Sequence, residues 1–325
     1  MSENIVVSGI RPTGVPHLGN IRGALQQWVN LQDNHNCFYF VADWHALFGL
    51  EERSREIAEN TKKAVATLLA IGLDPDKSTI FIQSHVPAHL TLFTIFSAIT
   101  PVGWLERNPT LKDMVRADQP LPYGLLGYPV LQAADILLYK GTMVPVGKDQ
   151  QPHLEITREI ARRFNNLFGT DCFPEPQAVL NESPVLPGTD GRKMSKSYNN
   201  VISIEDDKDT IVNKVKQMIT DPEKIRKTDP GHPDICTVFQ LEKPFVDGTY
   251  SADIYQRCTE GRIGCVEHKN MLAEIIWDYL RPKQEKYFYY LEHEEQLKKI
   301  VDYGDKRAQE VAQKTIEEVM DIIGL

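Results

Sequence analysis

Hydrophobic and polar positions alternate in two different ways along the first half of the chain. Short runs rich in β-branched and aromatic residues are typical of buried strands, and they occupy residues 5–8, 37–41, 79–83 and 143–146. Longer stretches with helical spacing lie between or after them, at residues 21–34, 54–72, 90–99, 128–138 and 154–166. This alternation predicts an α/β fold with a doubly wound parallel (Rossmann-like) sheet, in which ligands bind at the carboxyl ends of the strands.

The strand pattern disappears from about residue 203 onward. Amphipathic helices are expected instead, at residues 209–220, 271–281, 283–291, 294–303 and 305–323. Residues 221–250 are dense in Pro, Gly and Asp and read as an irregular connection. We therefore predict a Rossmann-like domain over residues 1–186, a mobile loop over 187–202 and an all-helical domain over 203–325.

Composition narrows the class of protein without naming a function. The 325 residues are 42% hydrophobic and 25% charged, as in ordinary soluble domains. An odd number of cysteines, five, argues against a secreted disulfide framework, and neither a signal peptide nor a membrane span is apparent. A cytoplasmic protein with no membrane partner is expected. The net charge of −9 argues only weakly against a nucleic-acid partner, because a local basic patch can be hidden in the average.

Two short segments carry the chemistry. The first is Pro-Thr-Gly-Val-Pro-His-Leu-Gly-Asn at 12–20, between a strand and a helix, and the second is Lys-Met-Ser-Lys-Ser at 193–197. Glycines at a strand-to-helix turn let backbone N–H groups approach a phosphate closely. The first segment has the glycine spacing of a phosphate-binding P-loop, but Asn20 and Ile21 stand where that motif needs Lys and Ser or Thr.

Together the two segments resemble the paired signatures of class I aminoacyl-tRNA synthetases. The resemblance implies attack of an amino-acid carboxylate on the α-phosphate of ATP, a step that depends on positioning and charge stabilisation. His17 would donate a hydrogen bond to phosphate oxygens in the transition state. Lys193 and Lys196, with Ser195 between them, would close on the triphosphate from a glycine-flanked loop.

A third feature lies between the signatures. If residues 128–138 are helical, Tyr128, Gln132 and Asp135 share one face, because they are spaced at i, i+4 and i+7. Polar groups on an otherwise apolar helix need partners, and a ligand is one such partner. The alternative is a surface helix whose polar face meets water.

This stretch, with Val-Pro-Val-Gly-Lys-Asp-Gln at 144–150, resembles the bacterial tryptophanyl-tRNA synthetase family, and the similarity covers nearly the whole chain. The resemblance implies that Asp135 accepts the indole N–H and that Tyr128 and Gln150 hold the ammonium group. It also implies a pocket lined by His45, Gln132, Val7, Val144 and Val146. The positions it implies for ATP binding are Arg11, Thr13, Gly19, Asn20, Gly147, Asp149, Lys193, Met194 and Lys196.

The function implied is ATP- and Mg²⁺-dependent formation of tryptophanyl-adenylate, followed by transfer to tRNA(Trp). The helical domain would bind the anticodon, and a homodimer would form through an insertion at about residues 90–128. Tyrosine–tRNA ligase is the first alternative, because the Tyr-x3-Gln-x2-Asp pattern also occurs in tyrosyl enzymes and some tryptophanyl enzymes have Met at the position of Gln132. The second is a synthetase-like paralogue that binds nucleotide or RNA without aminoacylation.

Cysteine spacing suggests a metal site in the second half. Cys236, Cys258, Cys265 and His268 form C-x21-C-x6-C-x2-H, and three thiols with an imidazole are a competent ligand set for a soft metal. Some members of the family carry four cysteines here that bind a [4Fe–4S] cluster, and His268 stands at the last position. Three interpretations remain: an iron–sulfur cluster with one histidine ligand, a zinc site, or free thiols. A bound metal is favoured.

Overall fold

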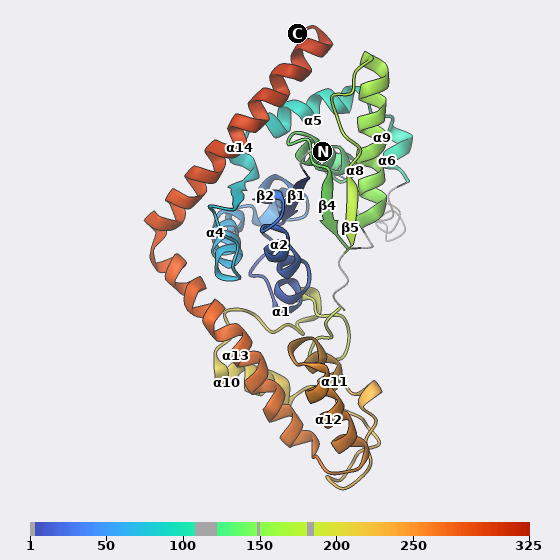
Figure 1. Cartoon of the computed structure of the whole chain (residues 1–325), viewed down its shortest axis with the longest axis vertical. Helices are drawn as coiled ribbons and strands as arrows, with labels where there is room; N and C mark the ends of the chain where they lie inside the picture. Colours follow the sequence, from blue (N-terminus) through green and yellow to red (C-terminus); the bar gives the residue numbers. More distant parts are fainter. Residues whose placement is uncertain (1–3, 108–121, 148–149, 181–184) are drawn as a thin grey trace. The chain divides into compact units, whose positions relative to one another are not determined.

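A five-stranded parallel sheet organises the first part of the protein. The structure is a computed structural model that describes residues 4–107, 122–147, 150–180 and 185–325. The strands lie in the order β3-β2-β1-β4-β5, of which β2, β1, β4 and β5 are labelled in Figure 1, so the direction of winding reverses between β1 and β4. Their bounds are Ile5–Ile10 (β1), Asn36–Val41 (β2), Ser78–Ile82 (β3), Met143–Val146 (β4) and Gln177–Leu180 (β5). The predicted doubly wound α/β fold is confirmed.

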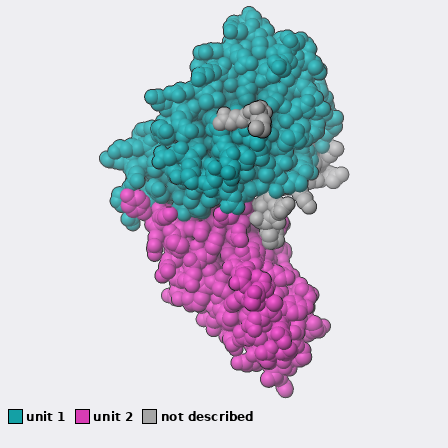
Figure 2. Space-filling model, in the orientation of Figure 1, with its two compact units in different colours: residues 1–14, 27–181, 290–325 teal, residues 15–26, 182–289 magenta. Residues whose placement is uncertain are grey.

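The described chain separates into two compact units, coloured teal and magenta in Figure 2. Unit 1 takes the described residues of 1–14, 27–181 and 290–325, and it contains the sheet. Unit 2 takes the described residues of 15–26 and 182–289, and it is mainly helical.

The helices of unit 1 include those of residues 88–105, 123–168 and 294–323, which pack against the sheet around one large apolar core. Their bounds are Gln26–Leu31 (α2), Asp43–Leu47 (α3), Glu51–Arg53 (η2), Arg55–Ala70 (α4), Gln83–His85 (η3), Ala88–Ile99 (α5), Val102–Leu105 (α6), Tyr123–Leu137 (α8), Gln151–Phe168 (α9) and Glu294–Ile323 (α14). Helix α14 is continuous, whereas the sequence predicted a break near residue 304. At Gly304 the helix packs closely against β3. A side chain does not fit there, because a Cβ would lie 1.8 Å from the carbonyl oxygen of Ile80.

Unit 2 begins with a short, irregular helical passage and continues as a helical assembly. Its elements are Leu18–Asn20 (α1), Ile21–Leu25 (η1), Lys196–Tyr198 (η5), Lys208–Lys216 (α10), Pro233–Ile235 (η6), Thr237–Glu242 (α11), Lys243–Phe245 (η7), Gly248–Thr259 (α12) and Cys265–Glu292 (α13). The sequence predicted two helices where α13 is one. Pro282 lies inside it, and the fully buried Leu280 and Tyr287 on either side anchor the helix through the proline.

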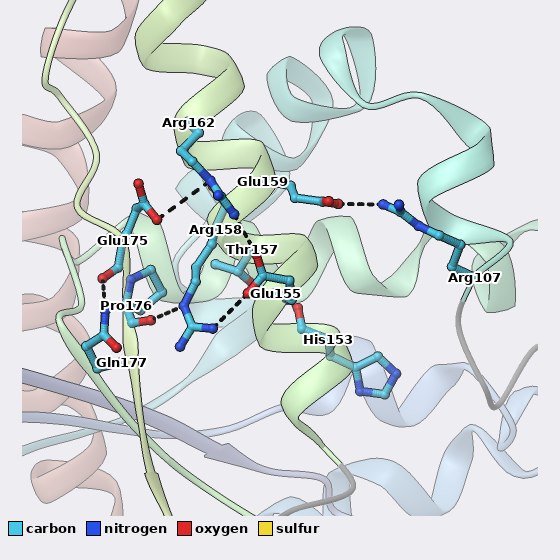
Figure 3. Close-up of polar contacts among 10 residues, drawn as sticks. All are labelled: Arg107, His153, Glu155, Thr157, Arg158, Glu159, Arg162, Glu175, Pro176 and Gln177. Carbon is cyan, nitrogen blue, oxygen red and sulfur yellow. Dashed lines mark hydrogen bonds and ion pairs between the residues drawn. The ribbon is translucent and has the colours of Figure 1, made fainter.

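Strand β5 is absent from the sequence prediction because it is short and its four residues are exposed or half-buried. Helix α9 holds the segment that leads into it (Figure 3). Arg158 donates from Nε to the carbonyl oxygen of Pro176 at 2.7 Å, and Arg162 forms an ion pair with Glu175 at 3.6 Å. Tertiary contacts therefore support a strand that its own pattern does not indicate.

Membrane insertion through a helix has no support here: in the described ranges, every helix is too short or too polar to cross a bilayer.

Candidate active site

Asp135 of α8 lies at the centre of a buried hydrogen-bond network in unit 1. Its side chain is 2% exposed. Oδ1 accepts from Gln83 Nε2 and from His89 Nδ1, both at 2.7 Å, and Oδ2 accepts from His45 Nε2 at 2.8 Å. These donors come from elements that follow the carboxyl ends of β2 and β3, the edge where parallel sheets bind ligands.

The network keeps Asp135 ionised. Burial pushes the pKa of its carboxyl group up, but the hydrogen bonds from His45 and His89 outweigh burial and hold that pKa at about 2. Asp135 is thus a buried anion at neutral pH. A carboxylate has about four lone-pair positions, and the three donors found among the described residues leave one acceptor position on Oδ2.

Tyr128 and Gln150 are joined by a residue to which the sequence assigned no role. The Tyr128 hydroxyl lies 2.8 Å from His153 Nε2, and His153 Nδ1 lies 3.0 Å from Gln150 Oε1. Because the amide oxygen of Gln150 can only accept, Nδ1 donates and Nε2 accepts from the tyrosine. His153 thereby brings together two side chains that are far apart on α8 and at the start of α9.

The other residues predicted for the amino-acid pocket also lie in unit 1. Val7 and Val144 are buried within the apolar core, whereas Val146 and Gln132 are half-buried. β1 and β4 are the strands where the sheet reverses direction, and Arg11 and Gly147 follow their carboxyl ends. Arg11 donates to the carbonyl oxygen of Phe48 at 3.0 Å, and Thr13 is exposed. Asp149 lies outside the described residues.

The two signature segments meet inside unit 2. Leu18 donates from its backbone N–H to the carbonyl oxygen of Ile202 at 2.8 Å. His17 pairs with Ser203 through an isolated antiparallel β-bridge of the backbone. A Cβ on Gly19 would lie 3.6 Å from the Cβ of Met194. Asn20 accepts the His17 backbone N–H at 3.1 Å, which orders the turn.

His17 is a neutral donor in this setting. Burial, together with the charges of Lys196 and Lys193, lowers the pKa of its imidazole to about 4. Among the described residues, its buried Nδ1 has no hydrogen-bond partner. Lys196 is at the surface, yet loss of hydration lowers the pKa of its ammonium group. A neutral imidazole beside two lysines is suited to receive an anionic group such as a phosphate.

Asn200 organises the loop that carries the lysines and Ser195. Its side chain is almost fully buried, and its Oδ1 accepts the Ser195 backbone N–H at 2.8 Å. Its Nδ2 donates to the Lys193 carbonyl oxygen at 3.1 Å and to Asp190 Oδ1 at 2.6 Å. Gly188 is required beside it, because a Cβ there would lie 2.2 Å from Asn200 Nδ2.

The predicted metal ligands are only partly brought together. Burial raises the pKa of Cys236 and Cys258, and charge interactions among Cys236, Cys258 and Cys265 contribute. His268 points elsewhere: its Nε2 lies 3.0 Å from Glu242 Oε2, and both side chains are buried. Within the described ranges, no three His, Cys, Asp or Glu side chains are arranged to hold a metal ion. The residues as placed do not fit a four-ligand metal site.

Sequence reasoning missed His89, Gln83, Tyr139, His153 and Asn200 as parts of the site. A buried histidine such as His89 is indistinguishable in the sequence from a core residue. Only His153, three residues after Gln150 and so on the same turn of a helix, had a spacing that could have pointed to it.

Comparison with known proteins agrees with this geometry. The family model described as tRNA synthetases class I (W and Y) matches residues 1–281. A tryptophan–tRNA ligase of Thermotoga maritima is 45% identical, and one of Aquifex aeolicus is 40% identical, each over 98% of this chain and 99% of the relative.

A crystal structure of tryptophanyl-tRNA synthetase from Campylobacter jejuni, complexed with ADP and tryptophan, superposes with a TM-score of 0.91 at 38% identity. The match covers 99% of this chain and all of that one. A tyrosyl-tRNA synthetase from Archaeoglobus fulgidus, at 20% identity and a TM-score of 0.68, shares the fold alone. The chain belongs to the class I tRNA synthetases of the tryptophan and tyrosine group, and within that group to the tryptophan–tRNA ligases.

Proposed function

We propose that this protein activates L-tryptophan with ATP and transfers the resulting acyl group to tRNA(Trp). The observation that carries the proposal is the buried, ionised Asp135 with one acceptor position left on Oδ2. An indole N–H is a donor that this position can take, and an apolar pocket that lacked the carboxylate would not select it.

The remaining pocket residues orient the amino acid. Tyr128 and Gln150, linked through His153, would hold the ammonium group, because the tyrosine hydroxyl oxygen and the amide oxygen are both acceptors. Gln132 and the valines at 7, 144 and 146 would contact the ring system. Held in this way, the carboxylate is the part of tryptophan that remains to attack the α-phosphate.

The phosphate-binding residues stabilise the charge that develops during this attack. Neutral His17 donates a hydrogen bond, while Lys193 and Lys196 supply positive charge from a loop that Asn200 pre-orders. Bound Mg²⁺ would neutralise phosphate oxygens as the pyrophosphate leaves. The other nucleotide contacts proposed are Arg11, Thr13, Gly19, Asn20, Gly147 and Met194, and Ser195 is proposed as a catalytic residue between the two lysines.

Two further aspects of this proposal concern assembly and location. We propose a homodimer, as the resemblance to the synthetase family implies. Part of the segment predicted for dimerisation, residues 108–121, lies outside the described residues. Light scattering on the purified protein tests this assembly. A cytoplasmic location follows from the need for ATP and tRNA.

Amino-acid-dependent exchange of pyrophosphate into ATP tests the activity. We expect exchange with tryptophan and little with tyrosine, and charging of tRNA(Trp) in a second assay. Faster exchange with tyrosine would instead support the tyrosine enzyme. Normal exchange without charging would support a paralogue that does not aminoacylate.

A further inference from the structure

Oδ1 of Asp135 is held by two side chains that lie outside the predicted pocket. Gln83 belongs to η3 and His89 to α5, and both are completely buried. They share one oxygen of the carboxylate, whereas His45 is the donor to the other among the residues that the structure describes. The two oxygens therefore differ: Oδ1 is saturated by donors, and Oδ2 keeps the spare position.

The tautomer of His89 follows from its two partners. A carboxylate only accepts, so Nδ1 must carry the proton that it donates to Asp135. In the neutral imidazole Nε2 then has a lone pair, which accepts a hydrogen bond from the Tyr139 hydroxyl 2.9 Å away. Tyr139 is also completely buried, and its ring stacks on Phe38 with centroids 4.7 Å apart. The relay from Tyr139 through His89 to Asp135 is thus fixed by packing at one end and by charge at the other.

We propose that His89 is a positioning residue for indole selection: by binding Oδ1 it locks the Asp135 carboxylate so that Oδ2 accepts the substrate N–H. This inference rests on the proposed function. His89 does not touch the substrate in this scheme and acts only through Asp135. Without His89, the carboxylate could rotate about its Cβ–Cγ bond, and the acceptor would lose its fixed direction.

The groups that face Asp135 come from several elements: His45 on α3, Gln83 on η3, His89 on α5 and Tyr139 after α8. Loss of the His89 donor leaves burial less opposed, so the pKa of Asp135 rises. Replacing a histidine that does not contact Asp135 would leave unchanged the pH at which tryptophan binding weakens.

The test compares tryptophan with β-(benzothienyl)alanine, in which sulfur replaces the indole N–H. In the pyrophosphate exchange assay, the parent enzyme should favour tryptophan strongly in kcat/KM. His89→Leu should reduce this preference about tenfold or more, mainly by raising KM for tryptophan. His89→Asn, which can place an amide N–H near the position of Nδ1, should restore much of it. On acidification, KM for tryptophan should begin to rise at a higher pH in His89→Leu than in the parent.

His85→Gln is the matched control, because it breaks another histidine–carboxylate pair, His85 with Asp305 at 2.5 Å, in the same short helix as Gln83. The control should leave the preference unchanged. If His89→Leu does not fold, Tyr139→Phe is tested instead, with the same ratio of kcat/KM for tryptophan and the analogue. This substitution removes only the hydroxyl oxygen that is hydrogen-bonded to His89 Nε2.

An unchanged preference and pH profile in the variant that folds would overturn the inference. Lack of tryptophan-dependent exchange in the parent enzyme would instead overturn the proposed function, so the two failures are distinguishable.

Discussion

Replacing Asn200 with alanine should disable the phosphate-binding loop while leaving tryptophan binding intact. The substitution removes three side-chain hydrogen bonds, to Ser195 N–H, to the Lys193 carbonyl and to Asp190. Each neutral bond contributes about 1 kcal/mol and the bond to Asp190 somewhat more, although water replaces part of this at an exposed loop. We expect the ordered loop to lose about 2–4 kcal/mol relative to open conformations.

This loss translates into activity because the lysines act only when the loop holds them in place. The value of kcat/KM for ATP should fall by between about 30-fold and about 900-fold, since each 1.36 kcal/mol corresponds to a factor of ten. Pyrophosphate exchange at varied ATP measures this value, and calorimetric titration with tryptophan measures the amino-acid affinity, which should stay within about twofold.

Asn199→Gly is the matched control. Asn199 adopts a φ of 50°, which glycine accepts without cost, and its side chain is exposed. The control should retain nearly full activity. The reasoning is refuted if Asn200→Ala keeps kcat/KM for ATP within about threefold of the parent, or if it weakens tryptophan binding as much as ATP use.

Three further predictions concern other parts of the molecule. Because the pKa of His17 falls from 6.5 to about 4 on folding, the unfolded chain binds more protons in this interval, so stability should fall as the pH drops through it. Urea midpoints at about pH 7 and about pH 5 should differ less in His17→Gln than in the parent, and an equal difference would contradict this. Gly304→Ala should lower the free energy of unfolding by about 2–3 kcal/mol, because its Cβ meets the Ile80 carbonyl at 1.8 Å. In chemical denaturation, the control Gly103→Ala, whose Cβ meets no described residue within 4 Å, should change the free energy of unfolding by less than about 1 kcal/mol. Asp135→Asn should lower kcat/KM for tryptophan about 100-fold or more in the exchange assay, since a donor replaces the acceptor, and a loss below tenfold would count against the assigned role.

Local sequence pattern predicted most of the elements of the sheet. Four of the strands have β-branched or aromatic runs that few other conformations accommodate, and the helices of unit 1 show clear apolar faces. Strand β5 was not predicted because its stability comes from contacts with β4 and α9. The continuity of α13 through Pro282 was also not predicted. Buried residues on both sides of the proline stabilise the helix by more than the missing backbone hydrogen bond costs.

The residues of the candidate site likewise fall into those that the sequence predicted and those that it did not. His17, the two lysines, Tyr128 and Asp135 were identifiable because their chemistry requires those residue types at those spacings, and the resemblance to a known family rested on them. His89 and Asn200 were not identifiable, because one contacts a residue distant in the chain and the other orders a loop, whereas His153 was indicated only by its spacing from Gln150.

By itself, the sequence determined the α/β fold and identified the two segments that we propose bind phosphate and the carboxylate that we propose selects indole, that of Asp135. These features rest on residue type and on short spacings, which survive without knowledge of the fold. Only the tertiary structure decided which donors saturate Oδ1 of Asp135, which lysines lower the pKa of His17, and that His268 pairs with Glu242. Hydrogen bonds and desolvation depend on distances of a few ångströms between distant segments, and folding alone sets those distances.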